Sequence, residues 1–499
     1  MAKQLNAILS SAIQFDMANL INNFDLFIDG SWAQSEVSDR IERTHPGSGE
    51  LVSTYARGTK GDVEKAVSAA NKAFQGPWRT LTAQQRSDLL FEGAGALFAQ
   101  REKLAGIEST ETGKPFKHAL DDICNGIQLW KYAASSLRTL HGEIYPSLDP
   151  NFLGMTFFEP VGIVGLITPW NFPFIVAAER LPFILAAGCT IVCKPSEYAS
   201  GTSLFTAEIL SEAGFPPGVV NVVTGFAENV GIPLVEHPKV AMISFTGSSE
   251  NGRRVMETAS KTLKRLSLEL GGKSPILVFA DANLDAAADG VIAGFTHNAG
   301  QCCIATTRLL VERSIASRFE TILTQKLRSN FGEGKPQPVA TLPQFNKVAN
   351  SIKDGNNTGR CLFGEQPGNP ADGLFVQPHV FADLPPDSPL VRNEIFGPVL
   401  TVNVFDTENE AIQLANDTIY GLAATIWSED QCKAVRVTKA IRAGRIWLNS
   451  QQVNFPELPV GGFGASGIGR EAGSTGIRTY SEIKTIIMAQ NGTKPSNLI

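Results

Sequence analysis

Four short, almost continuously apolar segments follow one another in the middle of this 499-residue chain, at positions 162–167, 189–194, 219–224 and 242–245. Segments of helical length separate these four, opening after Asn171, after Ser196 and after Phe226. Strands that alternate with helices in this way form parallel sheets, and strands covered on both faces need apolar side chains throughout. The pattern therefore predicts an α/β fold with a doubly wound parallel sheet.

A second α/β run begins at positions 274–279 and continues to about position 448, with longer loops that are rich in proline. A chain of 499 residues is unusually long for a single hydrophobic core, so two or three domains are expected. Glycine and proline crowd positions 456–473, which indicates an ordered loop close to a ligand or to another backbone segment.

Charge and composition exclude several classes of protein. The net charge of −6 leaves no basic surplus for binding nucleic acid. The apolar run at 183–193 is shorter than the ~18 residues that a membrane span needs, and the first residues lack the features of a secretory signal. The seven cysteines fit no zinc spacing, so no metal site is predicted, and reduced thiols in the cytoplasm are the simplest interpretation.

Two motifs indicate covalent acyl chemistry: Asn-Ala-Gly-Gln-Cys-Cys-Ile-Ala at 298–305 and Leu-Glu-Leu-Gly-Gly-Lys at 268–273. A cysteine thiolate attacks a carbonyl carbon, and a carboxylate activates a thiol or a water. Two further motifs are Thr-Pro-Trp-Asn-Phe-Pro at 168–173 and Asn-Glu-Ile-Phe-Gly-Pro at 393–398. In the order and spacing of these motifs, from about position 27 to about position 485, the chain resembles the NAD(P)-dependent aldehyde dehydrogenase superfamily.

The resemblance implies that an aldehyde is oxidised to a carboxylic acid through a cysteine thiohemiacetal and a thioester, which water then hydrolyses. By the family motif Gly-Gln-x-Cys the nucleophile is Cys303, although chemistry alone leaves the neighbouring Cys302 open. Asn171 would donate its amide to the oxyanion, together with the backbone N–H of Cys303. Glu269 would be the base, and its apolar surroundings are expected to raise its pKa.

The usual dinucleotide fingerprint of three spaced glycines follows none of the predicted strands. The resemblance instead assigns the cofactor contacts to groups near the strand ends. These are Ile167, Thr168, Trp170, Lys194, Ser196, Glu197, Gly225, Gly247, Ser248, Leu270, Glu394 and Phe396. A carboxylate at position 197 would repel a ribose 2′-phosphate, so NAD is favoured over NADP as the cofactor.

Five residues are predicted to face the aldehyde. Phe174, Phe295 and Phe455 would line a tunnel, and Glu179 and Glu457 would place carboxylates near it. The loop around Glu457 resembles that of betaine- and aminoaldehyde dehydrogenases, so a cationic aldehyde is the expected substrate. A neutral or aromatic aldehyde is the alternative, because the aromatic residue that this branch often carries at position 179 is absent.

Two other functions fit the same fold. A CoA-acylating semialdehyde dehydrogenase releases the thioester with CoA, and such relatives typically lack the glutamate that stands at Glu269. A structural or binding protein with dead chemistry would have lost Cys303, Glu269 or Asn171, and all three are present. Aldehyde oxidation with water as the acyl acceptor is therefore favoured over both.

The resemblance also divides the chain. Residues 1–141 and 162–270 would form the NAD-binding domain, and 271–450 the catalytic domain. Residues 451–477 would form a substrate-tunnel loop that returns to the cofactor domain. Residues 142–161 and 478–499 would form a small β element for oligomerisation, whose free strand edge needs a partner. A homodimer or a homotetramer is therefore expected.

Overall fold

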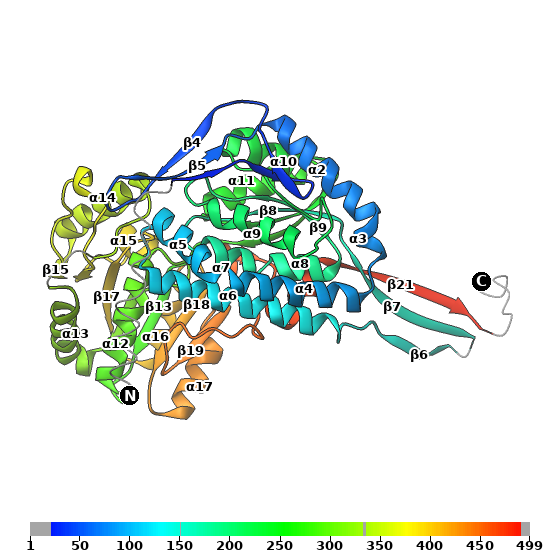
Figure 1. The fold of residues 1–499 in the computed structure, drawn as a ribbon. Coiled ribbons are helices and arrows are strands. Elements are labelled where there is room, and N and C mark those ends of the chain that lie inside the picture. The colour runs from blue at the N-terminus through cyan, green and yellow to red at the C-terminus, as the bar shows by residue number, and fades with distance from the viewer. Residues whose placement is uncertain (1–20, 150, 333–335, 491–499) are drawn as a thin grey trace, which may run out of the picture.

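The computed structural model describes residues 21–149, 151–332 and 336–490. Within these ranges, two large sheets flanked by helices form the body, and a narrow three-stranded sheet projects from it (Figure 1). Residues 1–20 and 491–499, which belong to the predicted cofactor domain and to the predicted oligomerisation element, lie outside the described residues. In the described part, no helix is long and apolar enough to cross a membrane.

The first large sheet contains all four strands that the apolar segments predict. Its order is β20 (Gly467–Ile468), β12 (Arg265–Glu269), β11 (Val240–Thr246), β8 (Ile163–Ile167), β9 (Thr190–Lys194), β10 (Val220–Val222), β2 (Leu26–Ile28) and β3 (Ser31–Ala33). The five central strands, β12 to β10, run parallel, and antiparallel strands lie at both edges. The predicted α/β class with a doubly wound parallel sheet is confirmed.

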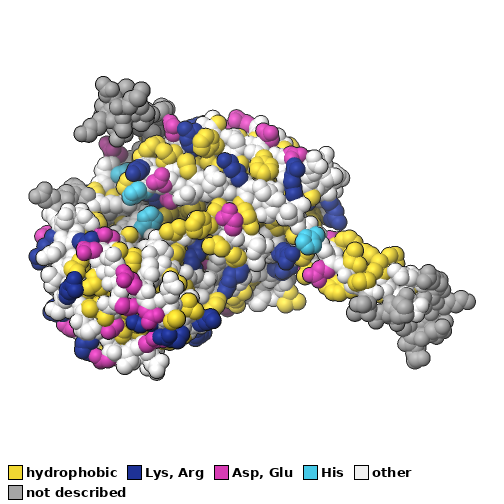
Figure 2. All heavy atoms as spheres, turned by 90° about the horizontal axis from the view of Figure 1, so that it is seen from below, with side chains coloured by type: hydrophobic (Ala, Val, Ile, Leu, Met, Phe, Trp, Pro, Cys, Tyr) yellow, Lys and Arg dark blue, Asp and Glu magenta, His cyan; other side chains and the backbone are white. Residues whose placement is uncertain are grey.

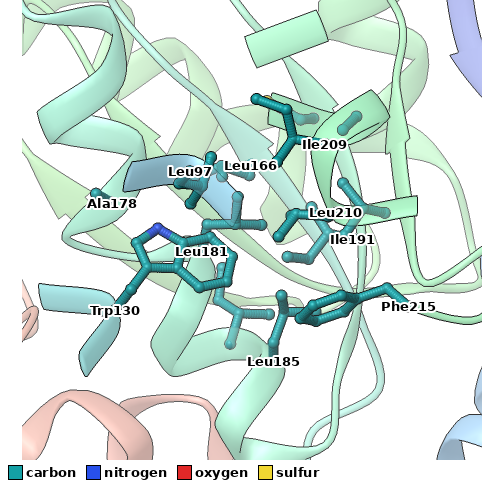
Figure 3. Packing of buried hydrophobic residues seen from close by; sticks show 14 of the residues in the cluster. Leu97, Trp130, Leu166, Ala178, Leu181, Leu185, Ile191, Ile209, Leu210 and Phe215 are labelled. Atoms are coloured by element: carbon teal, nitrogen blue, oxygen red, sulfur yellow. The ribbon is translucent and has the colours of Figure 1, made fainter. Parts of the chain in front are cut away.

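Helices pack on both faces of this sheet. Apolar side chains of α3 (Pro77–Thr80), α4 (Ala83–Ala99), α5 (Arg101–Thr112), α6 (Phe116–Leu137), α7 (Pro173–Ala178), α8 (Leu181–Ala187) and α9 (Gly201–Glu212) form one core. Those of α2 (Lys60–Gln75), α10 (Ile232–Glu236) and α11 (Ser249–Ser260) form the core of the opposite face. Figure 3 shows Trp130 in the first core beside Leu181 and Leu185, with Phe215 edge-on at a centroid distance of 6.4 Å.

The second large sheet is built from the later α/β run. Its order is β15 (Arg360–Phe363), β16 (His379–Ala382), β17 (Val399–Phe405), β14 (Thr306–Glu312), β13 (Ser274–Val278), β18 (Ala423–Trp427) and β19 (Arg445–Leu448). All neighbours are parallel except β15 and β16. Its helices are α12 (Leu284–Thr296), α13 (Ala316–Phe331), α14 (Leu342–Thr358), α15 (Pro389–Arg392), α16 (Glu408–Asn416) and α17 (Gln431–Ala440).

Two small sheets complete the described part. Strands β1 (Asn22–Phe24), β5 (Leu51–Ala56) and β4 (Arg40–Thr44) form one, and β21 (Ser481–Ala489), β7 (Phe152–Pro160) and β6 (Ile144–Asp149) form the other. Figure 1 shows β7 and β21 side by side in an arm that leads away from the body. The short helix α18 (Gly476–Thr479) lies at the base of this arm and precedes β21 directly.

The two large sheets are joined by a very short connection. β12 ends at Glu269 and β13 begins at Ser274, so the chain passes from one sheet to the other through Gly271 and Gly272. In parallel α/β sheets ligands bind beyond the carboxyl ends of the strands. This connection starts at the carboxyl end of β12, so it lies where a site of the first sheet is expected.

Candidate functional site

The loop that carries the two adjacent cysteines has an unusual backbone. After α12, Asn298 and Ala299 have φ angles of 50° and 53°, and Gly300 has a φ of 70°. Left-handed conformations of this kind are strained for residues with a β-carbon and are tolerated best by glycine and asparagine. A β-carbon on Gly300 would lie 2.3 Å from the backbone of Gly397, so only glycine fits at this position. The surrounding structure therefore has to hold the loop in place.

Hydrogen bonds from Asn171 and Gln301 hold this loop. The Asn171 Nδ2 donates to the carbonyl oxygen of Gln301 at 2.9 Å, and the Asn298 Nδ2 donates to the carbonyl oxygen of Asn171 at 2.9 Å. The Gln301 Nε2 donates in turn to the carbonyl oxygen of Asn298, also at 2.9 Å. Asn171, the predicted oxyanion donor, follows β8, so this network ties the first sheet to the cysteine loop.

The two cysteines differ in their surroundings. Cys302 is buried and packs against Phe172 and Ala305, whereas Cys303 is only half-buried. A hydrogen bond with Cys302 and burial raise the pKa of the Cys303 thiol, and the charges of Glu179 and Glu394 raise it further. The accessible thiol of the pair is thus Cys303, and it needs a base to become a thiolate.

Glu269 ends β12 with only 6% of its surface exposed. Burial raises its pKa well above that of an ordinary glutamate; Arg180 counteracts this shift, and Glu471 and Cys303 add to it. Its Oε1 has no hydrogen-bond partner among the described residues. Such a carboxyl group, with one free oxygen and a raised pKa, can exchange protons with a thiol or a water.

A buried guanidinium accompanies this carboxyl group. Arg180 is 1% exposed; its Nη1 donates to the carbonyl oxygen of Val176 at 2.7 Å and to Glu179 Oε2 at 3.1 Å. Its Nε lies 3.9 Å from Glu471 Oε1. Glu471 is fully buried and accepts a hydrogen bond of 2.6 Å from the hydroxyl of Tyr480. Glu471 was missed in the sequence, where its only signal is a charge within a glycine-rich loop.

Another group of residues links the short connection between the two large sheets to the segment 393–398. Glu394 Oε1 accepts a hydrogen bond from the backbone N–H of Gly272 at 2.9 Å, and a β-carbon on Gly271 would lie 2.3 Å from its Oε2. Phe396 has a φ of 61°, and its ring packs edge-on against Trp170 at 5.5 Å. The predicted cofactor residues Trp170, Glu394 and Phe396 therefore lie together. Leu270, also predicted, is buried one residue before Gly271.

Two residues near this cluster were not predicted from the sequence. The side-chain amide of Gln344 donates to the carbonyl oxygens of Ile395 and Phe396, both at 2.9 Å, and so fixes the left-handed turn at Phe396. The charge of Lys347 lowers the pKa of Glu394, which burial raises. Both belong to α14, whose sequence has the ordinary pattern of an amphipathic helix and gives no functional signal.

The remaining predicted cofactor residues lie where strands of the first sheet end. Lys194 is buried at the end of β9, and its Nζ lies 3.4 Å from Glu197 Oε2. The other predicted cofactor residues either end or closely follow β8, β9, β10 or β11. They are Ile167, Thr168, Ser196, Gly225, Gly247 and Ser248.

Details of these strand ends bear on what they can bind. Ser248 is the N-cap of α11, since its hydroxyl accepts from the backbone N–H of Asn251 at 3.2 Å. Gly225 has a φ of 152° and leaves no room for a side chain beside Val230. The buried hydroxyls of Thr168 and Thr246 have no partner among the described residues. These free hydroxyls and a helix N-terminus suit a polar, anionic ligand along this edge of the sheet.

The structure corrects two of the predicted substrate residues. Phe295 has no exposed surface and lies in the core of the second sheet, so it cannot line an open tunnel. Phe174 is 3% exposed and packs in the core that contains Trp130. Phe455 and Glu457 are exposed, and the Glu179 side chain is 23% exposed beside Arg180. The helical pattern of α12 places Phe295 on its inward face, which a motif alone does not reveal.

Phe172 and His297 are two aromatic residues near the cysteine pair that were not predicted from the sequence. Their rings stack at 5.6 Å, and Phe172 packs directly against Cys302. A cavity of about 380 Å³ borders His297, together with His118 and Gln337. Within the described ranges, no group of three or more His, Cys, Asp or Glu side chains could hold a metal ion.

Comparison with known proteins gives a consistent result. The sequence profile of the aldehyde dehydrogenase family matches residues 32–486. The chain is 40% identical to aldehyde dehydrogenase, cytosolic 1, of Mus musculus, covering 96% of this chain and 97% of the relative. It is 38% identical to aminoaldehyde dehydrogenase 1, peroxisomal, of Pisum sativum, with coverages of 94% and 96%.

Solved structures agree with this match. The crystal structure of an NAD-dependent aldehyde dehydrogenase from Sinorhizobium meliloti superposes with a TM-score of 0.94 at 42% identity, covering 97% of this chain and 98% of that one. Betaine aldehyde dehydrogenase from Staphylococcus aureus, in complex with NAD+, superposes with a TM-score of 0.91 at 35% identity, with coverages of 95% and 96%.

The contact between Gly272 and the cysteine loop leads to a testable prediction. A β-carbon on Gly272 would lie 2.6 Å from the carbonyl oxygen of Cys303, so Gly272→Ala must push the loop away. We expect kcat/KM for NADH formation to fall by about 10- to 100-fold, as for other small displacements of catalytic groups. Gly95→Ala is the control, because nothing lies within 4 Å of its β-carbon. Equal activity of the two variants would contradict the prediction.

Proposed function

Because this chain belongs to the aldehyde dehydrogenase family, we propose that it oxidises an aldehyde to a carboxylic acid through Cys303, with NAD as the cofactor. The observation that carries this proposal is the grouping of three residues. A half-buried thiol lies in a loop held by the amide of Asn171, and Glu269, which has one free carboxyl oxygen, lies close enough to Cys303 for the charge of the thiolate to raise its pKa. A nucleophile, an oxyanion donor and a base are what acyl chemistry requires.

In the proposed reaction, Cys303 gives its proton to the Glu269 carboxylate, which releases it to solvent, and the thiolate adds to the aldehyde carbon. One N–H of the Asn171 amide is bonded to the carbonyl of Gln301, and its second N–H is available for the oxyanion together with the backbone N–H of Cys303. Bound NAD would supply the hydride acceptor, so that loss of hydride from the thiohemiacetal carbon leaves a thioester on Cys303. Glu269 then takes a proton from water, and the hydroxide released attacks the thioester, which frees the acid and the thiol.

The strand ends of the first sheet fit a dinucleotide. The unpartnered hydroxyls of Thr168 and Thr246 supply hydrogen-bond donors, and the N-terminus of α11 at Ser248 offers backbone N–H groups to a pyrophosphate. Lys194 and Glu197 would hold the hydroxyls of the adenosine ribose, and Glu394 those of the nicotinamide ribose. The carboxylate of Glu197 favours NAD over NADP, because it would repel a 2′-phosphate.

Charge near the site favours a cationic aldehyde as substrate. Arg180 is the cation between Glu179 and Glu471, so these three side chains together are acidic. A carboxylate on the substrate would be repelled there, whereas an ammonium group would be attracted. Among the similar proteins, the one from Pisum sativum is named an aminoaldehyde dehydrogenase and the one from Staphylococcus aureus a betaine aldehyde dehydrogenase. A neutral or aromatic aldehyde is the alternative, favoured by the stacked Phe172 and His297.

We also propose that the projecting arm joins copies of this chain into a homodimer or homotetramer. Within the described residues β21 pairs only with β7, so its other edge is free. Ile483 and Ile487 on this strand are 65% and 72% exposed, and Figure 2 shows hydrophobic side chains gathered on the arm. Exposed apolar strand edges of this kind are normally covered by another strand.

We also propose a cytoplasmic location, which is supported by seven cysteines that are all free.

The first prediction identifies the nucleophile. Cys303→Ala should abolish NADH formation, because the proposed nucleophile is lost, and should leave NAD binding, measured by fluorescence titration, nearly unchanged. Cys302→Ala should retain most of the activity, since this buried side chain packs against Phe172 and Ala305 and its hydrogen bond with Cys303 raises the pKa of the nucleophile. If the two variants behave in the opposite way, Cys302 is the nucleophile.

The second prediction concerns the base. Since the pKa of Glu269 is raised, its carboxylate fraction, and with it the steady-state rate, should still increase as pH rises above the range in which an ordinary glutamate titrates. Glu269→Gln keeps the shape and cannot accept a proton, so a burst of NADH should be followed by turnover about 100- to 10,000-fold slower. Stopped-flow traces over a pH series measure both. Unchanged steady-state turnover of the variant at every pH would remove Glu269 from the mechanism.

The third prediction concerns substrate charge and the acyl acceptor. Betaine aldehyde or 4-trimethylaminobutyraldehyde should have a higher kcat/KM than succinate semialdehyde, and Glu179→Arg should narrow or reverse that ratio. Glu457→Arg makes the same charge reversal at the other predicted carboxylate, which is exposed and contributes only about 0–1 kcal/mol, so it should change the ratio less than Glu179→Arg does. Added CoA should leave the rate unchanged. A wild-type preference for succinate semialdehyde would contradict the charge argument, and acyl-CoA formation would point to the CoA-dependent reaction.

The fourth prediction tests assembly. Light scattering coupled to gel filtration should give the mass of two or four chains for the wild type. Ile483→Glu combined with Ile487→Glu should give single chains, because two carboxylates would be placed on the free strand edge. Leu263→Glu changes a leucine that is 92% exposed outside the arm and should leave the mass unchanged. A wild-type mass of one chain would overturn the proposed assembly.

A further inference from the structure

Strand β4 buries a positive charge where its pattern calls for an apolar side chain. Its residues alternate between exposed and buried, and the two inward positions are Ile41 and Arg43. Arg43 is 6% exposed. A buried guanidinium is tolerated only where its N–H groups find acceptors, so the partners of Arg43 indicate its role.

The partners of Arg43 belong to three separate parts of the chain. Its Nε donates to the carbonyl oxygen of Glu111, at the end of α5, at 2.7 Å. Its Nη2 donates to the same oxygen and, at 2.7 Å, to the carbonyl oxygen of Ala340. Its guanidinium carbon lies 5.9 Å from the centre of the Tyr198 ring, which follows the predicted cofactor residue Glu197. Arg43 thus lies between the helices of the first sheet and the segment that leads into α14.

Ala340 continues this connection to the cysteine loop. While its carbonyl accepts from Arg43, its backbone N–H donates to Gln301 Oε1 at 2.8 Å. Gln301 directly precedes Cys302, and its own carbonyl accepts the amide of Asn171. One peptide segment therefore connects the guanidinium of Arg43 to the side chain that holds the left-handed loop of Cys303.

The hydrogen bonds of Arg43 form a junction between Glu111 and Ala340. From Glu111, further hydrogen bonds lead to the predicted adenosine site. Glu111 Oε1 accepts from the Ser53 hydroxyl at 2.8 Å, and Oε2 accepts from the backbone N–H of Gly201, the first residue of α9, at 3.1 Å. The hydroxyl of Ser200 donates to the carbonyl oxygen of Ser196 at 2.8 Å. Burial raises the pKa of Glu111 to about 7, although its hydrogen bonds and Arg43 counteract this shift. Arg43 thus lies between the cysteine loop, which it reaches through Ala340, and the predicted adenosine site, which it reaches through Glu111.

We propose that Arg43 is a positioning residue for the reaction: by fixing Ala340 it holds Gln301, and through Gln301 the loop that places Cys303 against Asn171 and Glu269. This inference rests on the proposed role of Cys303. Loss of the guanidinium frees the carbonyl of Ala340 and lets the Gln301 side chain shift. The strained backbone at Asn298 and Ala299 then relaxes away from the geometry that the attack requires.

Arg43→Met, Arg43→Lys and Gln301→Ala test the proposal by the rate of the NADH burst, the KM for NAD and the melting temperature. Arg43→Met should slow the burst by about 10- to 100-fold with a smaller change in the KM for NAD. Arg43→Lys keeps the charge but not the fork that reaches two carbonyls, so its rate should be intermediate. Arg40→Met is the control, because Arg40 is on the same strand and pairs instead with Asp25 at 2.9 Å.

A double-mutant cycle separates positioning from stability alone. If Arg43 acts through Gln301, the variant that combines Arg43→Met with Gln301→Ala should be no slower than the slower of the two single variants. The inference would be overturned if the fold-losses in burst rate of the two single variants multiply in the double variant. It would also be overturned if the burst rate of Arg43→Met equals that of Arg40→Met. If Arg43→Met does not fold, Arg43→Lys decides, since a burst rate and melting temperature equal to the wild type would also overturn it. Activity of Cys303→Ala would instead overturn the proposed function.

Discussion

The close packing of Gly272 against the carbonyl of Cys303 sets the geometry on which the rest of the site depends. It brings the chain that links the two large sheets into contact with the strained loop before Cys303. Gly272 also donates to Glu394, and Glu269 ends the strand that leads into this link. A side chain at Gly271 or Gly272 would separate these groups, so the two glycines allow the predicted nucleophile, base and ribose-binding carboxylate to belong to one site.

Burial of charge gives this site its chemical character. Glu269 and Glu471 are buried carboxyl groups, Glu394 is half-buried, and Arg180 is the buried cation beside Glu269 and Glu471. Burial and the excess of carboxyl groups over cations raise the pKa of Glu269 above that of a glutamate in water. Each further negative charge in a poorly solvated region is costly, so Glu269 keeps its proton to a higher pH. The same imbalance underlies the proposed preference for cationic aldehydes. The proposed proton transfer and the proposed substrate preference would thus have one physical origin.

Apolar runs in the sequence were sufficient to predict the strands of the first large sheet, whereas the residues at the strand ends were assigned from the resemblance to the aldehyde dehydrogenase superfamily. Apolar runs locate buried strands, and parallel strands bring the residues that follow them to one edge, as at Asn171, Lys194 and Glu269. Side-chain direction within a helix depends on packing, which is why Phe295 was wrongly assigned to the tunnel. Contacts between distant segments leave no local pattern. Glu471, Gln344 and the junction at Arg43 could therefore be found only in the structure.

The central claim is that the acyl group is carried by Cys303 and released by Glu269. The most direct test is to mix the Glu269→Gln variant with NAD and an aldehyde, quench with acid and map the peptides by mass spectrometry. The account predicts an adduct on Cys303 that requires NAD and has the mass of the aldehyde less two hydrogens, because a thioester has replaced the thiol hydrogen. An adduct on Cys302, or continued NADH formation with no acyl adduct, would contradict it.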